Sequence, residues 1–269
     1  MTWREIGDRI WVRRWPFLDQ TIGVVAGAKC VAVIDTRSSI GHGHALLAEM
    51  RGLTALPHLV VNTHHHWDHT LGNAAFRPCA AWGHARCAER LRAAGDDEKA
   101  KALTWSSELA ADLAETPVDP PERTFETAAM VKLGGRTLEL RHFGRGHTDN
   151  DIAIAIDGVV FAGDLFEQGA PPSGGDSYPF EWPATLGQLL DFGGDEAVYV
   201  PGHGEPVDAE FVRAQLAEVA FLAEAARRAD PGASAKALAA AVAPQLGWPG
   251  AYAADILERA LGQLRGEIE

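Results

Sequence analysis

The chain has 269 residues, of which 46% are hydrophobic and 23% are charged, and its formal net charge is −13. This composition is typical of globular proteins and argues against a largely disordered chain. A chain with so many acids repels phosphate groups unless it carries a local basic patch, and its longest run of Lys and Arg is a pair. Nucleic acid is therefore excluded as an expected partner.

Neither a membrane span nor a secretory signal is expected from the sequence. No stretch of about 18 apolar residues occurs, which is the length that a membrane helix needs. Residues 1–11 contain no apolar core of the kind that signal peptides carry. The cysteines Cys30, Cys79 and Cys87 are too few and too scattered for a disulfide framework or a thiolate zinc site. We therefore expect no membrane partner and a reducing, cytoplasmic location.

The first third of the chain is dominated by short apolar runs bounded by Gly, Asp and Asn, a pattern that predicts strands. These predicted strands cover residues 9–15, 21–27, 30–36 and 58–64. Residues 42–53 carry apolar side chains at helical spacing and end near Gly52, which predicts a helix before the fourth strand. Residues 68–76 predict a turn into a short helix.

The order of strands followed by helices then occurs a second time. Residues 84–115 are mostly helical in pattern, until a proline-rich stretch breaks the run. Further strands are predicted at residues 130–135, 136–144, 150–157, 158–164 and 197–204. From Asp208 onward the pattern is amphipathic and helical. This order predicts an α/β fold made of two halves, with the sheets packed together and the helices outside.

The densest group of chemically active side chains is the segment THHHWDH, which follows the strand at 58–64. If the chain stays extended, alternate side chains share a face, so His64 and His66 point one way and His65 points the other. Asp68 then continues the first face, and His69 follows where the chain turns. Imidazole nitrogen and carboxylate oxygen suit Zn²⁺ and similar metals. Four such donors are too many for one closed site, which favours two adjacent metals.

Three further donors follow apolar strands later in the chain. His147 stands in GRGHTDND, Asp164 in FAGDLF and His203 in VPGHGEP. Side chains at the ends of neighbouring strands can converge at one rim of a sheet, so we expect these three residues to meet the first cluster.

These segments in this order, THHHWDH followed by GHT, AGD and PGHG, resemble the metallo-β-lactamase superfamily. The first string, with its later Gly-Asn, is most similar to the glyoxalase II-like branch. The resemblance implies an α/β fold, the four-layer αβ/βα sandwich of that superfamily, over residues 1–210. Residues 211–269 would then form a C-terminal helical extension packed on the same domain.

The resemblance also implies how the donors divide between two metals. The implied ligands are His64, His66 and His147 on one metal, Asp68, His69 and His203 on the other, and Asp164 bridging both. Asp35 would orient the ligands through hydrogen bonds. The implied cofactors are two Zn²⁺ ions, and Fe or Mn would accept the same donors.

The implied activity is hydrolysis of an ester, thioester, lactone or amide by a hydroxide that bridges the two metals. Asp68 would be both a metal ligand and the catalytic acceptor of the nucleophile's proton. Two alternatives stay open at this point. One is a mononuclear iron enzyme of the sulfur dioxygenase kind, which the superfamily also contains, and the other is a non-catalytic metal-binding module.

The segment 166–185 directly follows Asp164 and is rich in Gly, Pro and aromatic residues. It is either a plain surface loop or a wall that contacts the substrate through Phe166, Tyr178 and Trp182. Trp67 either packs the scaffold or joins this wall. The expected partner is a small-molecule substrate, and a homodimer is compatible with the sequence.

Overall fold

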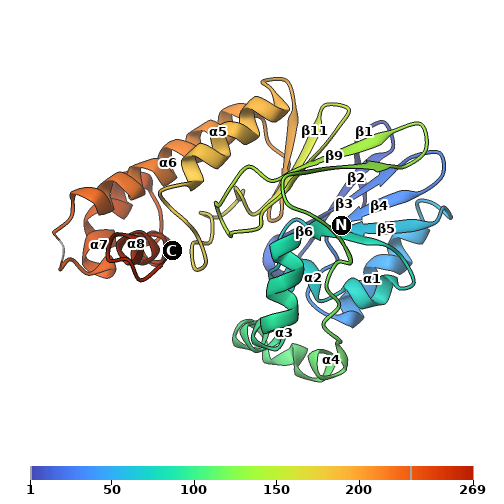
Figure 1. Cartoon of the computed structure of the whole chain (residues 1–269), viewed down its shortest axis with the longest axis horizontal. Coiled ribbons are helices and arrows are strands. Elements are labelled where there is room, and N and C mark those ends of the chain that lie inside the picture. The colour runs from blue at the N-terminus through green and yellow to red at the C-terminus, as the bar shows by residue number, and fades with distance from the viewer. Residues whose placement is uncertain (1, 231, 269) are drawn as a thin grey trace.

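A computed structural model describes residues 2–230 and 232–268 of the chain (Figure 1). Within these residues the strands form a seven-stranded and a five-stranded sheet. The first sheet contains, in spatial order, β1 (Arg4–Gly7), β2 (Ile10–Trp15), β3 (Gln20–Ala26), β4 (Val31–Ile34), β5 (His58–Val61), β6 (Ala81–His84) and β7 (Arg123–Phe125). The second contains β12 (Val198–Pro201), β11 (Val159–Gly163), β10 (Ala153–Ile156), β9 (Thr137–Arg141) and β8 (Ala128–Lys132).

Helices cover the outer faces of the two sheets. The α-helices are α1 (Ile40–Arg51), α2 (Trp67–Thr70), α3 (Ala85–Trp105), α4 (Ala110–Glu115), α5 (Trp182–Gly193), α6 (Ala209–Arg228), α7 (Ala235–Leu246) and α8 (Gly250–Leu264). Short 3₁₀ turns are η1 (Phe17–Asp19), η2 (Asn73–Phe76) and η3 (Ser107–Leu109). In Figure 1, α1 lies on one side of the paired sheets and α5 and α6 lie on the other.

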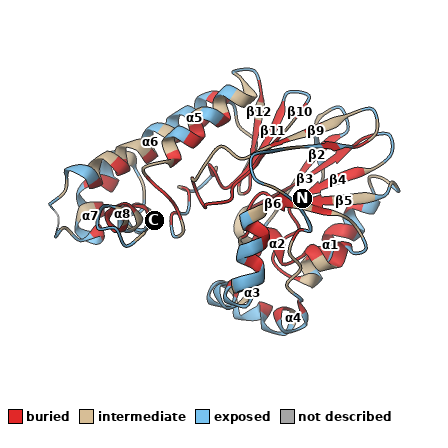
Figure 2. Ribbon diagram, viewed as in Figure 1, coloured by how far each residue is buried: buried red, intermediate tan, exposed pale blue. Residues whose placement is uncertain are grey.

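The alternation of side chains along the strands explains why the sheets stack. One face of the first sheet, including Ile34 and Val61, packs against Leu140 and Ile154 of the second sheet in one buried cluster. The opposite face of the first sheet packs on α1, where Leu46 is fully buried. The central strands such as β3, β4 and β11 are buried, whereas the edge strands β1, β7 and β8 and the outer helix faces are partly exposed (Figure 2). These layers confirm the predicted four-layer αβ/βα sandwich.

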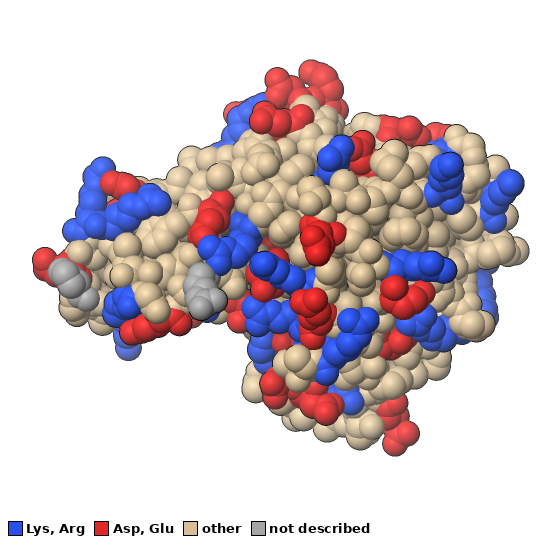
Figure 3. All heavy atoms as spheres, viewed as in Figure 1, with Lys and Arg blue, Asp and Glu red and all other residues tan. Residues whose placement is uncertain are grey.

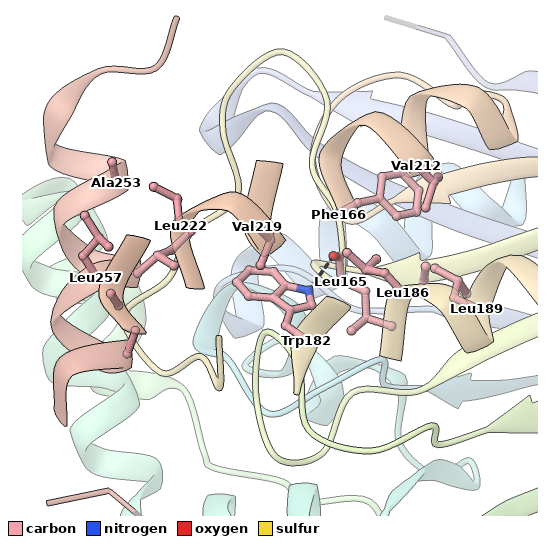
Figure 4. Close-up of a cluster of buried hydrophobic side chains, with 14 of the residues drawn as sticks. Leu165, Phe166, Trp182, Leu186, Leu189, Val212, Val219, Leu222, Ala253 and Leu257 are labelled. Carbon is pink, nitrogen blue, oxygen red and sulfur yellow. Dashed lines mark hydrogen bonds between the residues drawn. The ribbon is translucent and has the colours of Figure 1, made fainter. Parts of the chain in front are cut away.

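The outer face of the second sheet shares its core with the C-terminal helices. Leu186 of α5, Val212 and Val219 of α6 and Leu257 of α8 all belong to one hydrophobic cluster (Figure 4). The boundary predicted at residue 210 falls just inside α6, which begins at Ala209. Among the described residues, no helix has the length and apolar content that crossing a membrane requires.

The parallel strands of both sheets end at one common edge. β4 and β5 run parallel in the first sheet, and β11 and β12 run parallel in the second. The residues that follow these four strands are Asp35, Asn62, Asp164 and Gly202. This edge therefore gathers the polar segments that the sequence placed after separate apolar strands.

Candidate metal centre

The segment after β5 is not extended. β5 ends at Val61, and α2 begins at Trp67. The intervening turn is held by the Asn62 amide, which donates to the carbonyl of His69 at 3.2 Å, and by the Thr70 hydroxyl, which donates to the carbonyl of His66 at 2.9 Å. The expectation of a continuous extended chain to Asp68 is wrong, because a helical turn brings Asp68 and His69 back over the strand end.

One group of potential metal ligands forms around His66. Its Nδ1 atom lies 3.1 Å from His64 Nε2 and 3.0 Å from His147 Nε2. Asp164 Oδ2 lies 3.6 Å from both His64 Nε2 and His147 Nε2. His64 and His147 are almost fully buried, so bulk water does not separate these atoms.

A second group of potential ligands lies beside the first. Asp68 Oδ2 is 3.4 Å from His69 Nε2 and 3.2 Å from His203 Nε2, and the two ring nitrogens are 3.3 Å apart. Asp164 Oδ2 is also 3.3 Å from His69 Nε2 and 3.4 Å from His203 Nε2. The Asp164 carboxylate therefore faces both groups, and the structure brings together all seven residues that the sequence singled out.

The other ring nitrogen of each histidine has a partner that fixes where the proton sits. His147 Nδ1 donates to the Ser173 carbonyl at 2.9 Å, and His203 Nδ1 donates to the Leu18 carbonyl at 2.8 Å. His69 Nδ1 donates to Asp35 Oδ2 at 2.8 Å. Each of these rings therefore presents a bare lone pair on Nε2.

In the remaining two rings, those of His66 and His64, a hydrogen bond likewise fixes which nitrogen carries the proton. His66 Nε2 donates to Asp176 Oδ2 at 3.0 Å, which leaves Nδ1 bare. The Thr63 hydroxyl donates to Asp35 Oδ2 at 2.7 Å, so it accepts from His64 Nδ1 at 3.0 Å and leaves Nε2 bare. In their neutral forms, the five imidazole rings thus direct a nitrogen lone pair, and not an N–H group, toward the two carboxylates.

Such an arrangement fits metal ions. Two carboxylates and five imidazole rings face one small space, and Asp164 Oδ1 is buried there with no hydrogen-bond partner. Ligands at about 2.0–2.2 Å from a tetrahedral zinc lie roughly 3.3–3.6 Å apart, which is close to the separations observed here. The donor set and its spacing therefore suit one ion in each group.

Burial and neighbouring charges shift the protonation of these groups in opposite directions. Although burial lowers it, the carboxylates of Asp164 and Asp68 raise the pKa of His69 and of His203 well above the ordinary value, so metal binding at these two rings would displace a proton. Burial, reinforced by His69, lowers the pKa of His64 well below its ordinary value, and burial lowers the pKa of His147 as well. Burial alone would raise the pKa of Asp68, but His69 and His203 outweigh it and hold that pKa well below the usual range.

Asp35 supports two ligands from a strained backbone position. Its φ angle is +64°, a left-handed conformation that non-glycine residues seldom adopt. Oδ1 accepts from the Thr63 backbone N–H at 2.8 Å, while Oδ2 is shared by the Thr63 hydroxyl and His69. Local strain of this kind persists where the surrounding structure fixes a functional geometry.

His203 is positioned by a second strained segment. Leu18 and Asp19 have φ angles of +59° and +55°, and the carbonyl of Leu18 is the one that His203 contacts. Backbone hydrogen bonds join this segment to the loop after β12, from Thr21 N to Gly202 O at 2.7 Å and from Gly204 N to Asp19 O at 3.0 Å. A side chain at Gly202 would collide with Asp164 and His69, so only glycine fits there.

His65 does not belong to the converging lone pairs. Its Nδ1 accepts from the Asn150 side-chain amide at 2.9 Å, and the ring is buried. His65 Nε2 lies 4.0 Å from Asp176 Oδ2. This matches the interpretation that the middle one of the three consecutive histidines faces away from the ligand cluster.

A cavity of about 770 Å³ opens in front of the ligand cluster. Trp67 lines it, although only 6% of this residue is exposed, with its ring edge-on to Phe17. Phe166 and Trp182 lie in the core behind it and are not among its described lining residues (Figure 4). The Trp182 indole donates to the Leu165 carbonyl at 2.9 Å. Tyr178 lines a separate cavity of about 330 Å³.

The structure also identifies polar residues that the sequence did not single out. Asp176 contacts His66, and Lys101 of α3 lies 3.1 Å from the same carboxylate oxygen. Burial raises the pKa of Glu167, which lines the cavity, to about 7. Asp176 stands in a glycine-rich stretch with no strand before it, so no local pattern pointed to it.

Replacing Asp176 with asparagine is expected to weaken metal binding about tenfold, because the carboxylate fixes the tautomer of His66. This loss of zinc affinity lies at the low end of the range for residues that orient metal ligands, because 40% of the Asp176 side chain is exposed. Competition with a chromophoric zinc chelator measures the change. Asp195→Asn, at a surface carboxylate paired with Arg213, is the control. Equal zinc affinity in both variants would refute the positioning role.

Known proteins resemble this chain both in sequence and in fold. A family model described as the metallo-beta-lactamase superfamily matches residues 15–203, which is more than half of the chain. A solved structure of TMB-1 aligns with a TM-score of 0.63 and 18% identity, covering 81% of this chain and 95% of that chain. DIM-1 metallo-beta-lactamase aligns with a TM-score of 0.64 and 15% identity, covering 82% and 98%. At these identities the solved structures show a shared fold.

Proposed function

Because the chain belongs to the metallo-beta-lactamase superfamily and is a metal-dependent hydrolase, we propose that it is a dinuclear zinc enzyme that cleaves an ester, thioester, lactone or amide. The observation that carries this proposal is the convergence of bare imidazole nitrogens and two carboxylates in two adjacent groups. Each group offers the number and kind of donors that zinc accepts.

The assignment of ligands follows the two groups. His64, His66 and His147 would hold one ion, Asp68, His69 and His203 would hold the other, and Asp164 would contact both. Neutral imidazole and carboxylate donors suit zinc, and iron or manganese would compete for the same set. A pair of bound zinc ions supplies an activated water near neutral pH and positive charge to polarise a substrate carbonyl.

Side chains of this protein would accept the proton, orient the ligand histidines and limit the access of solvent to the site. Asp68 lies at the cavity wall, where its carboxylate can accept the proton that the attacking water loses. Asp35 and Asp176 hold His69 and His66 in the tautomers that face the metals. His64 and His69 are completely buried, and the members of the ligand cluster that line the cavity are His66, Asp68, His147, Asp164 and His203.

Metal analysis combined with a substrate panel tests the proposal. Protein produced without metal supplementation is expected to hold close to two zinc ions per chain. After metal quantification, it is assayed on matched esters, thioesters, lactones and β-lactams, and at least one bond type should be hydrolysed. One iron ion per chain with sulfur oxidation would favour the mononuclear dioxygenase. Full zinc occupancy with no turnover across the panel would favour a non-catalytic module.

A further inference from the structure

The cavity in front of the ligand cluster has a second wall, built by two helices that lie far apart in the sequence. The end of α3 contributes Lys101, Thr104 and Trp105, and the start of α8 contributes Tyr252 and Asp255. In Figure 3 the outline is notched between the part that carries α7 and α8 and the part that carries α3 and α4. This wall, here called the α3/α8 wall, faces the position where a substrate would approach the metals.

Both helices turn their packed faces away from the cavity. In α8, Ile256 and Leu257 are fully buried in the core, which leaves Tyr252 and Asp255 on the cavity side. In α3, Ala102 is buried against the cluster that contains Trp67. The two helices are therefore anchored from behind, and the wall is part of the packed fold.

The α3/α8 wall presents two aromatic side chains, Trp105 and Tyr252, beside the polar residues Lys101, Thr104 and Asp255. Trp105 is 65% exposed, although an indole is among the most costly side chains to leave in water. Leu18, Ala170 and Tyr252 line the same cavity. A large aromatic side chain left open at the mouth of an enzyme cavity indicates a contact for an apolar part of a ligand.

The charges on the cavity lining disfavour anions. Among the described lining residues, Lys101 is the only lysine or arginine, and its ammonium lies 2.8 Å from Glu98 and 3.1 Å from Asp176. Of the carboxylates of the lining outside the ligand cluster, Asp19 is paired with Arg14 and Asp176 with Lys101, while burial raises the pKa of Glu167 to about 7 and also raises the pKa of Asp255. A substrate carboxylate placed beyond the metals would therefore meet acids and a cation that is already paired.

We propose that the natural substrate is an uncharged acyl compound, an ester or a lactone, whose apolar acyl chain lies against Trp105 and Tyr252. This inference rests on the proposed hydrolysis and narrows it to one substrate class. The scissile group reaches the ligand cluster, and the acyl chain extends along the α3/α8 wall. Substrates that carry a carboxylate on the acyl chain are rejected by the acidic lining.

A series of 4-nitrophenyl esters tests the substrate class on zinc-loaded protein. From acetate to octanoate, kcat/KM is expected to rise at least about tenfold. Complete burial would raise kcat/KM about fourfold for each added methylene, so the expected rise corresponds to partial burial of the acyl chain. The mono-4-nitrophenyl ester of octanedioic acid has the same chain with a terminal carboxylate and should be about tenfold poorer than the octanoate. No gain with chain length, or a preference for the carboxylate, would overturn the proposal.

The variant Trp105→Ala tests whether the preference for a long acyl chain depends on this side chain. The ratio of kcat/KM for octanoate to that for acetate should fall about fivefold in this variant. Leu103→Ala is the matched control, because Leu103 lies on the same helix, is 42% exposed and is not among the residues that line the cavity. A chain-length ratio that stays unchanged in Trp105→Ala contradicts the assigned contact.

Binding measured by calorimetry separates this inference from the hydrolysis on which it rests. Octanamide, an uncharged probe, should bind the zinc-loaded wild type more tightly than butyramide does, and Trp105→Ala should reduce that difference. If no bond type of the substrate panel is hydrolysed but octanamide still binds through Trp105, the proposed reaction fails and the cavity assignment stands. If esters are hydrolysed but the two amides bind equally, the apolar contact is refuted and the reaction stands.

Discussion

Replacing Asp164 with asparagine is expected to lower the hydrolytic rate at least about a thousandfold, a loss of roughly 4 kcal/mol of transition-state stabilisation. Asp164 Oδ2 lies within 3.6 Å of the bare nitrogens of four histidines, so it is the one carboxylate that faces both ligand groups. An asparagine amide has no charge to offset two cations. We therefore expect the variant to lose zinc as well as activity.

The same substitution should leave the fold intact without metal. Asp164 lies 3.3 Å from His69 Nε2 and 3.4 Å from His203 Nε2 and raises the pKa of both rings, so the metal-free variant loses these ion pairs and should unfold at or slightly below the temperature of the metal-free wild type. Zinc content, kcat/KM and thermal unfolding are measured together. Asp191→Asn, at an exposed position of α5, is the control and should match the wild type. Full activity in Asp164→Asn would remove the basis for its bridging role.

Removing the metals is expected to lower the melting temperature by about 10 °C. Zinc that binds only the folded state stabilises it by about 4 kcal/mol when its free concentration is a thousand times the dissociation constant. For a chain of this size, each kcal/mol shifts the midpoint by roughly 2–4 °C. The reason lies in the cluster itself, since the folded chain holds nitrogen and carboxylate donors 3.0–3.6 Å apart, a spacing that suits a cation, whereas the unfolded chain does not.

Calorimetric scans before and after dialysis against a chelator, followed by stepwise return of zinc, measure this shift. The midpoint should recover fully with zinc and should show two stages if the two groups fill in sequence. Asp164→Asn should show only a small part of the shift. A midpoint that does not depend on chelator in the wild type would contradict a metal site at this edge of the sheets.

The hydrophobic pattern predicted two packed sheets with outer helices because the strands are short, apolar and clearly bounded, and the family resemblance implied the four-layer sandwich. The run at residues 30–36 contains β4, and the run at 158–164 contains β11, each with the polar residue directly after it. Such strands need covering on both faces, and this requirement predicts stacked sheets with outer helices. Local hydrophobic pattern was sufficient here because it reports burial, and burial dictates the layers.

The local geometry of the cluster could not be read from alternation. The period of two holds only within a strand, and β5 ends before His64. Contacts made by the long loop before α5 were also hidden, because Asp176 reaches His66 across 110 positions of the chain. The sequence around the aromatic residues Phe166 and Trp182 does not indicate whether their side chains face the cavity or the core. Packing with α6 places them in the core. The metal roles of the seven residues stay predictions.

The anchors of the five histidine rings divide into two kinds, and this division decides how each ring tolerates mutation. His147 and His203 are held by main-chain oxygens of Ser173 and Leu18, which every amino acid possesses, so the side chains at these two anchors can change without turning the rings. The other three depend on Thr63, Asp35 and Asp176, whose anchoring oxygens belong to side chains. Random mutagenesis should therefore find single-residue failures at these three anchors and tolerance at Ser173 and Leu18.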